Sequence, residues 1–122
     1  MQKQAVTLPY RPCPVERTIE LFSGRWKSAI IYHLRNEPVR FNELQRQIPF
    51  ISQRMLTYQL RRLETDGLVL RVDHQEKQPR VVYSLTPAGH SLGEVVLAIH
   101  KWGKRNESLL PSPTVENPKA AD

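Results

Sequence analysis

The hydrophobic positions between Ser52 and Gly67 predict a helix with two different faces. At about 100° per residue, Leu56, Leu60 and Leu63 share one stripe, and the opposite stripe is basic, hydroxylated and aromatic. Ser52 is a good N-cap because its hydroxyl can accept a hydrogen bond from the first turn. Gly67 can adopt the left-handed conformation that ends a helix. The leucine stripe requires a core, so the opposite face is free to contact another molecule.

The residues before this helix predict two shorter helices. The first covers Pro14–Phe22, because proline suits the first position of a helix, and Gly24 stops it. The second opens at Arg25 and turns four apolar residues inward: Ala29, Ile30, Ile31 and Leu34. Asn36 is expected to end it in the left-handed conformation, and Pro38 prevents it from continuing.

A third, brief helix leads into the two-faced one. Val39–Phe41 is a candidate short strand, and Asn42 is expected to cap a helix over Asn42–Gln47 that buries Leu44. Pro49-Phe50-Ile51 then forms a turn. A short helix, a tight turn and a longer basic helix make the helix-turn-helix pattern, whose second helix enters a DNA major groove.

Two strands follow the two-faced helix. Leu68–Val72 and Val81–Leu85 are strands by composition, and the polar loop between them makes a hairpin. A hairpin in this position is a wing, with Lys77, Gln78 and Arg80 near its tip, where they could reach the DNA backbone or a minor groove. A plain surface hairpin with solvated charges is the alternative.

The last helix starts with Thr86 as its N-cap and Pro87 at its first position. Its apolar stripe is long for a small domain and consists of Leu92, Val95, Val96, Ile99 and Trp102. We interpret the stripe as partly a dimer face, the alternative being that it only closes the monomer core. Trp26 and Trp102 are both expected in the core. The domain is expected to cover residues 13–107, between a flexible arm (1–12) and a disordered tail (108–122).

The charge distribution points to a polyanion as partner. The 122-residue chain carries a formal charge of +6, and +5 of it lies between Arg25 and Arg80, with 11 Lys+Arg against 6 Asp+Glu. Nucleic acid is the first expectation. A membrane is not expected, because no apolar run approaches the roughly 20 residues of a span. With one cysteine and no signal-peptide pattern, we expect a cytoplasmic protein without an intrachain disulfide.

The expected DNA contacts lie on the basic face and on the wing. Gln53 and Arg54, near the start of the helix, can bond adenine and guanine. Thr57 can meet a thymine methyl or a phosphate, and the residues beyond it suit phosphates, although Arg62 could instead pair with Glu64 or Asp66. The full candidate set is Ser52, Gln53, Arg54, Thr57, Tyr58, Arg61, Arg62, Lys77, Gln78 and Arg80. An ordinary surface helix whose charges are only solvated is the alternative.

A series of short motifs agrees in order and spacing with one known family. They are Cys13-Pro14-Val15, Gly24-Arg25-Trp26-Lys27, Arg40-Phe41-Asn42-Glu43-Leu44, Ile51-Ser52-Gln53-Arg54-Met55-Leu56-Thr57, Leu60-Arg61-Arg62-Leu63-Glu64, Asp66-Gly67-Leu68-Val69, Arg71 and Tyr83-Ser84-Leu85-Thr86-Pro87-Ala88-Gly89. Over roughly Cys13 to Trp102, the chain resembles the HxlR-type winged helix-turn-helix regulators of bacteria.

The resemblance implies an α+β, mostly α fold: a winged helix-turn-helix whose first and last helices form a homodimer. It implies a transcriptional regulator, often a repressor, which in some members responds to electrophiles or oxidants through the cysteine that aligns with Cys13, by alkylation or oxidation of its thiol. Two departures stand out. Asn36-Glu37-Pro38 occupies a turn where many members have a glycine, and this chain lacks the further cysteines that let some members form other disulfides.

Cys13 is a candidate redox-sensing residue. A thiol near a helix N-terminus, with Arg11 and Arg17 close in sequence, has reasons to ionise and react. The alternative is a passive, packed cysteine.

Regulation by a small effector in the dimer interface is a further option. No metal site, cofactor or catalytic constellation is expected. The other classes are a winged helix that binds RNA or docks a protein; the basic face disfavours docking.

Overall fold

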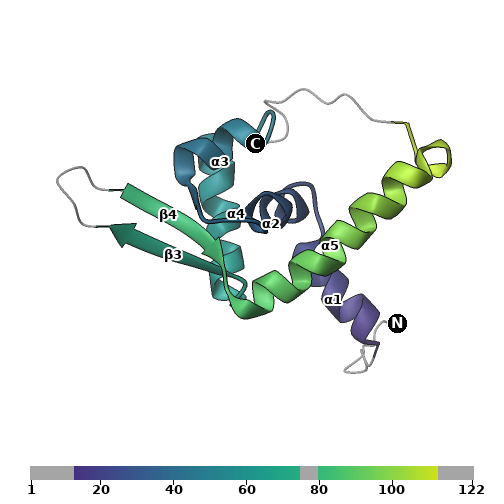
Figure 1. Ribbon diagram of the computed structural model, residues 1–122, viewed down its shortest axis with the longest axis horizontal. Coiled ribbons are helices and arrows are strands. Elements are labelled where there is room, and N and C mark those ends of the chain that lie inside the picture. The colour runs from purple at the N-terminus through teal and green to yellow at the C-terminus, as the bar shows by residue number, and fades with distance from the viewer. Residues whose placement is uncertain (1–12, 75–79, 113–122) are drawn as a thin grey trace, which may run out of the picture.

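The computed structural model describes residues 13–74 and 80–112. The described elements are α1 (Pro14–Phe22), α2 (Lys27–Leu34), β2 (Val39–Arg40), α3 (Phe41–Gln47), α4 (Gln53–Thr65), β3 (Val69–His74), β4 (Arg80–Leu85), α5 (Pro87–Arg105) and a 3₁₀ turn (Glu107–Leu109). Helices α2, α3 and α4 lie together, the β3–β4 hairpin projects to one side, and α5 runs away to the other (Figure 1). This is the predicted winged helix-turn-helix architecture.

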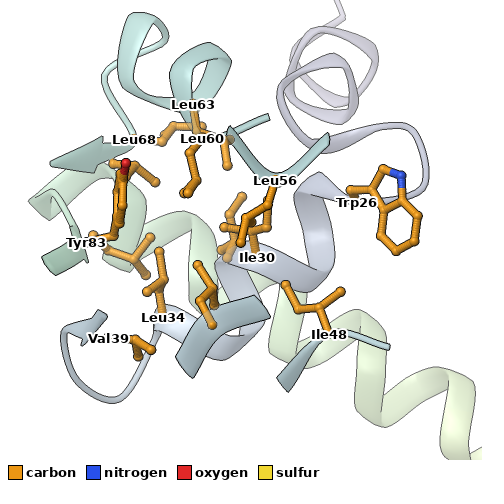
Figure 2. Close-up of a cluster of buried hydrophobic side chains, with 14 of the residues drawn as sticks. Trp26, Ile30, Leu34, Val39, Ile48, Leu56, Leu60, Leu63, Leu68 and Tyr83 are labelled. Atoms are coloured by element: carbon orange, nitrogen blue, oxygen red, sulfur yellow. The ribbon is translucent and has the colours of Figure 1, made fainter. Parts of the chain in front are cut away.

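The core is built around the leucine stripe of α4. Leu56, Leu60 and Leu63 are completely buried, as are Ile30 and Ile31 of α2. Figure 2 shows Ile30 directly beside Leu56 within one cluster of buried side chains. Each such side chain contributes roughly 1.5–3 kcal/mol on burial, so the predicted inward face of α4 is the centre of the hydrophobic core.

The sheet closes the core on one side. Its strand order is β2-β4-β3, and both pairings are antiparallel. The register pairs Val39 with Tyr83, and it pairs Val69 with Leu85. All four of these side chains are buried. The sheet therefore turns one face towards the helices, and its other face is left to solvent.

Helix caps agree with the prediction at two helices and differ at two others. Ser52 and Thr86 accept hydrogen bonds from Met55 and Gly89 N–H at 3.0 Å each, as expected of N-caps. Asn42, however, lies inside α3, because the extended residue before Phe41 already serves as its N-cap. Asn36 is not left-handed either. Instead, α2 ends with a 3₁₀-type bond that satisfies one of its last carbonyls, from the N–H of Arg35 to the Tyr32 carbonyl at 3.4 Å.

The C-terminal part of the described chain also differs from the prediction. The expected tail began at Ser108, but a 3₁₀ turn covers Glu107–Leu109. This turn brings Leu110 back to α5, where its Cδ1 lies 3.7 Å from the position of a Cβ on Gly103. Trp102 was expected in the core but is 49% exposed, because α5 extends beyond the domain. The predicted arm (1–12) and the rest of the tail (113–122) lie outside the described residues.

No helix in the described segments is both long and apolar enough to cross a membrane.

The start of α5 approaches the backbone at the end of α4 very closely, which generates a stability prediction. A Cβ on Gly89 would lie 2.1 Å from the Leu68 carbonyl oxygen. We therefore expect Gly89→Ala to lower the free energy of unfolding by about 1–3 kcal/mol, measured by urea denaturation. Gly93→Ala is the matched control, because its Cβ would meet its nearest neighbour, Arg35 Cβ, at an ordinary 3.6 Å. Equal effects at both positions would contradict the steric explanation.

Candidate DNA-binding interface

The turn between α3 and α4 is fixed by its own residues. Ile48 and Ile51 are both buried, and the Gln45 side-chain amide donates to the Ile51 carbonyl at 3.4 Å. At the start of α4, the Ser52 hydroxyl oxygen serves as the cap. Ser52 therefore acts first in positioning α4, and its place among the predicted DNA contacts remains a prediction.

The outward face of α4 brings most of the predicted contact residues together. Gln53, Arg54, Tyr58, Arg61 and Arg62 are exposed, and Thr57 is half-buried. The Thr57 hydroxyl donates to the Gln53 carbonyl at 2.9 Å. A phosphate contact from that proton would require breaking the bond within the helix, whereas the methyl group of Thr57 takes no part in it. Both roles predicted for Thr57, contact with a thymine methyl or with a phosphate, remain predictions.

The arginines of this region differ in how their charge is balanced. Arg46 of α3 bonds Glu43 at 2.5 Å, and this hydrogen bond and the arginine's charge lower the pKa of the Glu43 carboxyl. Within the segments that the structure covers, Arg54 and Arg61 form no ion pair. Their charge is available to a phosphate or a guanine edge.

Arg62 has a partner that the sequence reasoning did not consider. Its Nη1 lies 3.4 Å from the Tyr58 hydroxyl, and its guanidinium carbon lies 5.9 Å from the centre of the Tyr58 ring. The alternative pairing with Glu64 or Asp66 is not what the structure shows. Tyr58 and Arg62 are four residues apart, so they form one polar unit on the helix surface.

The wing is present, but only part of its predicted set can be placed. Arg80 opens β4 opposite His74, at the base of the connecting loop rather than at its tip. It borders an open recess of about 500 Å³, which is also lined by Arg40 of β2 and Arg46 of α3. Lys77 and Gln78 lie outside the described residues.

Cys13 lies at the N-cap position of α1, half-buried. Its carbonyl accepts a hydrogen bond from the Arg17 N–H at 3.2 Å, and its thiol makes no capping bond. Arg11, the other predicted basic neighbour, lies outside the described residues. In the described part of the chain, no group of three or more His, Cys, Asp or Glu side chains could hold a metal ion.

Two helices carry apolar side chains that the domain does not cover. α1 has no buried residue, and its Val15 and Ile19 are exposed. On α5, Leu92 and Val96 are buried, whereas Val95, Ile99 and Trp102 are about half exposed. The long apolar stripe of α5 is therefore divided between the core and the surface.

Phe50 is a feature that the sequence reasoning placed only as part of a turn. Its φ is +69°, the residue is 66% exposed, and it lies three positions before Gln53, the first residue of α4. The sequence signal was a large aromatic residue in a turn where a small one would be expected.

Comparisons with known proteins agree with this geometry. The model of the HxlR-like helix-turn-helix family matches residues 21–109. YybR of Bacillus subtilis strain 168, named an HTH-type transcriptional regulator, is 46% identical over 100 residues, covering 82% of this chain and 80% of its own.

Two solved structures extend the comparison. The redox regulator HypR in its reduced form superposes with a TM-score of 0.77 at 44% identity, covering 83% of this chain and all of the other. Diamide-treated YodB from B. subtilis superposes with a TM-score of 0.66 at 35% identity, covering 80% of this chain and 97% of the other. The chain therefore belongs to the HxlR-like helix-turn-helix family, and it is a transcriptional regulator of the helix-turn-helix type, not an enzyme.

Proposed function

We propose that the protein is a homodimeric repressor that binds an inverted-repeat DNA operator through α4 and the wing. The observation that carries this proposal is the outward face of α4. Opposite a fully buried leucine stripe, Arg54 and Arg61 are exposed there and pair with no acidic side chain among residues 13–74 and 80–112. Gln53 and Arg54 read bases, and Tyr58, Arg61 and Arg62 hold the backbone. The wing adds Arg80, Lys77 and Gln78. Two such helices would lie about 34 Å apart, one turn of DNA.

The uncovered apolar faces of α1 and α5 support the dimer. Val15 and Ile19 of α1, together with Val95, Ile99 and Trp102 of α5, leave apolar surface in water. A second copy of the chain would remove this surface from water, which is the usual driving force for subunit association.

We further propose that oxidation of Cys13 switches DNA binding. HypR is named a redox regulator, and YodB was solved after treatment with the thiol oxidant diamide. In the simplest form, two Cys13 thiols from two subunits lose two electrons and two protons to diamide, which becomes the hydrazine, and a Cys13–Cys13 bond forms. A mixed disulfide, an adduct or a sulfenic acid is an alternative product at the same sulfur. A small effector bound between the subunits is the competing switch.

The DNA proposal is tested by selection of bound duplexes from a randomised library, followed by fluorescence anisotropy at fixed salt. We expect an enriched inverted repeat. Arg54→Ala should weaken binding to it about 5- to 150-fold, because one base contact is worth roughly 1–3 kcal/mol, while the melting temperature stays unchanged. Arg105 is the last residue of α5, and α5 runs away from the wing (Figure 1). Arg105→Ala removes the same charge and should bind as wild type. Enrichment of single-stranded RNA alone would favour the RNA-binding class instead.

The dimer proposal is tested by sedimentation velocity. A glutamate at Ile99 would place a charge in the proposed interface, so Ile99→Glu should shift the protein towards monomer. Lys101→Glu introduces the same side chain on another face of α5 and should remain dimeric. A dimeric Ile99→Glu protein would place the interface elsewhere.

The switch proposal is tested with Cys13→Ser. We expect this variant to bind the selected duplex with wild-type affinity and to ignore diamide, whereas wild-type binding is lost with diamide and returns with dithiothreitol. If the serine variant still responds to diamide, Cys13 is not the sensor. If wild type ignores diamide as well, the small-effector switch takes precedence.

A further inference from the structure

The turn before α4 holds a phenylalanine in a backbone conformation that suits glycine. Phe50 has φ +69°, and it is the sole non-glycine residue with positive φ among those the structure describes. We propose that Phe50 is a specificity-determining residue, whose exposed ring contacts the methyl group of a thymine in the major groove. This inference rests on the proposed DNA-binding function, and it adds a base contact outside α4.

The turn itself requires the left-handed residue. Ile48 and Ile51 both point into the core, and the Ile51 N–H donates to the Ile48 carbonyl at 3.5 Å. The Gln45 side-chain amide donates a hydrogen bond to the Ile51 carbonyl. Two buried anchors three residues apart force the chain to reverse between them, and the reversal falls on residue 50.

The stability of the domain does not explain the choice of phenylalanine. A residue with a Cβ is disfavoured at positive φ, and glycine would relieve this strain. Packing could offset the strain if the ring were buried, but 66% of Phe50 is exposed. A strained, exposed aromatic side chain beside a binding surface indicates a contact made with the ligand.

The chemistry of the ring selects the group that it contacts. Phe50 precedes Gln53 and Arg54 by three and four residues, and it borders a recess of about 430 Å³ shared with Asn42 and Arg46. A phenyl ring has no hydrogen-bond donor or acceptor, so it cannot hold a phosphate or the polar edge of a base. The thymine methyl is the apolar group that the major groove offers, and apolar side chains contact it there.

The test measures Phe50 and the methyl group together. Each thymine of the selected duplex is replaced in turn by deoxyuridine, which lacks only the methyl, and binding is measured for wild type and for Phe50→Gly. For wild type, we expect one thymine per half-site at which the replacement weakens binding about fourfold, the effect of burying one methyl group. For Phe50→Gly, the same replacement should change nothing, and all other positions should behave as in wild type.

The controls separate this contact from folding and from the proposed function. Phe50→Gly should unfold at the same or a higher urea concentration than wild type, because glycine relieves the strained φ. Leu109→Ala removes an exposed apolar side chain from the 3₁₀ turn after α5, outside α4 and the wing, and should keep the wild-type deoxyuridine profile. If Phe50→Gly does not fold, Phe50→Asn is used in its place, because asparagine also tolerates positive φ.

If wild type selects no duplex, the proposed function fails before Phe50 is tested. If wild type selects a duplex but no thymine depends on its methyl, or if the same thymine depends on it in Phe50→Gly, the Phe50 inference is overturned and DNA binding stands.

Discussion

The arrangement of the molecule depends on one close contact between the start of α5 and the end of α4. Gly89 lies so near the Leu68 carbonyl that no side chain fits between them. Thr86 reinforces the contact, because its N–H donates to the Leu68 carbonyl at 3.0 Å and its hydroxyl donates to the Gly67 carbonyl at 2.7 Å. The direction in which α5 leaves the domain is thus set by the backbone that ends α4.

This contact joins the two surfaces on which the proposed function rests. α4 presents the basic face, and α5, which runs away from the wing, presents exposed apolar side chains (Figure 1). Because closely packed elements transmit a displacement instead of absorbing it, a change in how two α5 helices meet would alter the separation of their α4 helices. A switch at Cys13, the N-cap residue of α1, could then act on DNA binding without touching the basic face.

The sequence predicted those parts of the fold that depend on periodicity and on local capping. The leucine stripe, the Ser52 and Thr86 caps and the hairpin follow from spacing and side-chain chemistry, and all are present. Asn36 and Asn42 were misassigned because the ends of α2 and α3 are set by their neighbours: Arg35 closes one helix, and the strand residue Arg40 begins the other. The pairing of Arg62 with Tyr58 could not be distinguished in advance from pairing with a nearby acid.

At Phe50, the conformational preference of the residue conflicts with the positive φ that the turn requires. Along α4, the two tasks are separated by face: Leu56, Leu60 and Leu63 are buried in the core, and Arg54 and Arg61 are exposed. Substitutions on the outer face can therefore change which DNA is bound without unfolding the domain. In the turn the two tasks meet at one residue, because the backbone favours glycine and a glycine offers no side chain to a ligand. Conflicts of this kind are expected at functional positions, and this expectation supports the proposed contact between Phe50 and DNA.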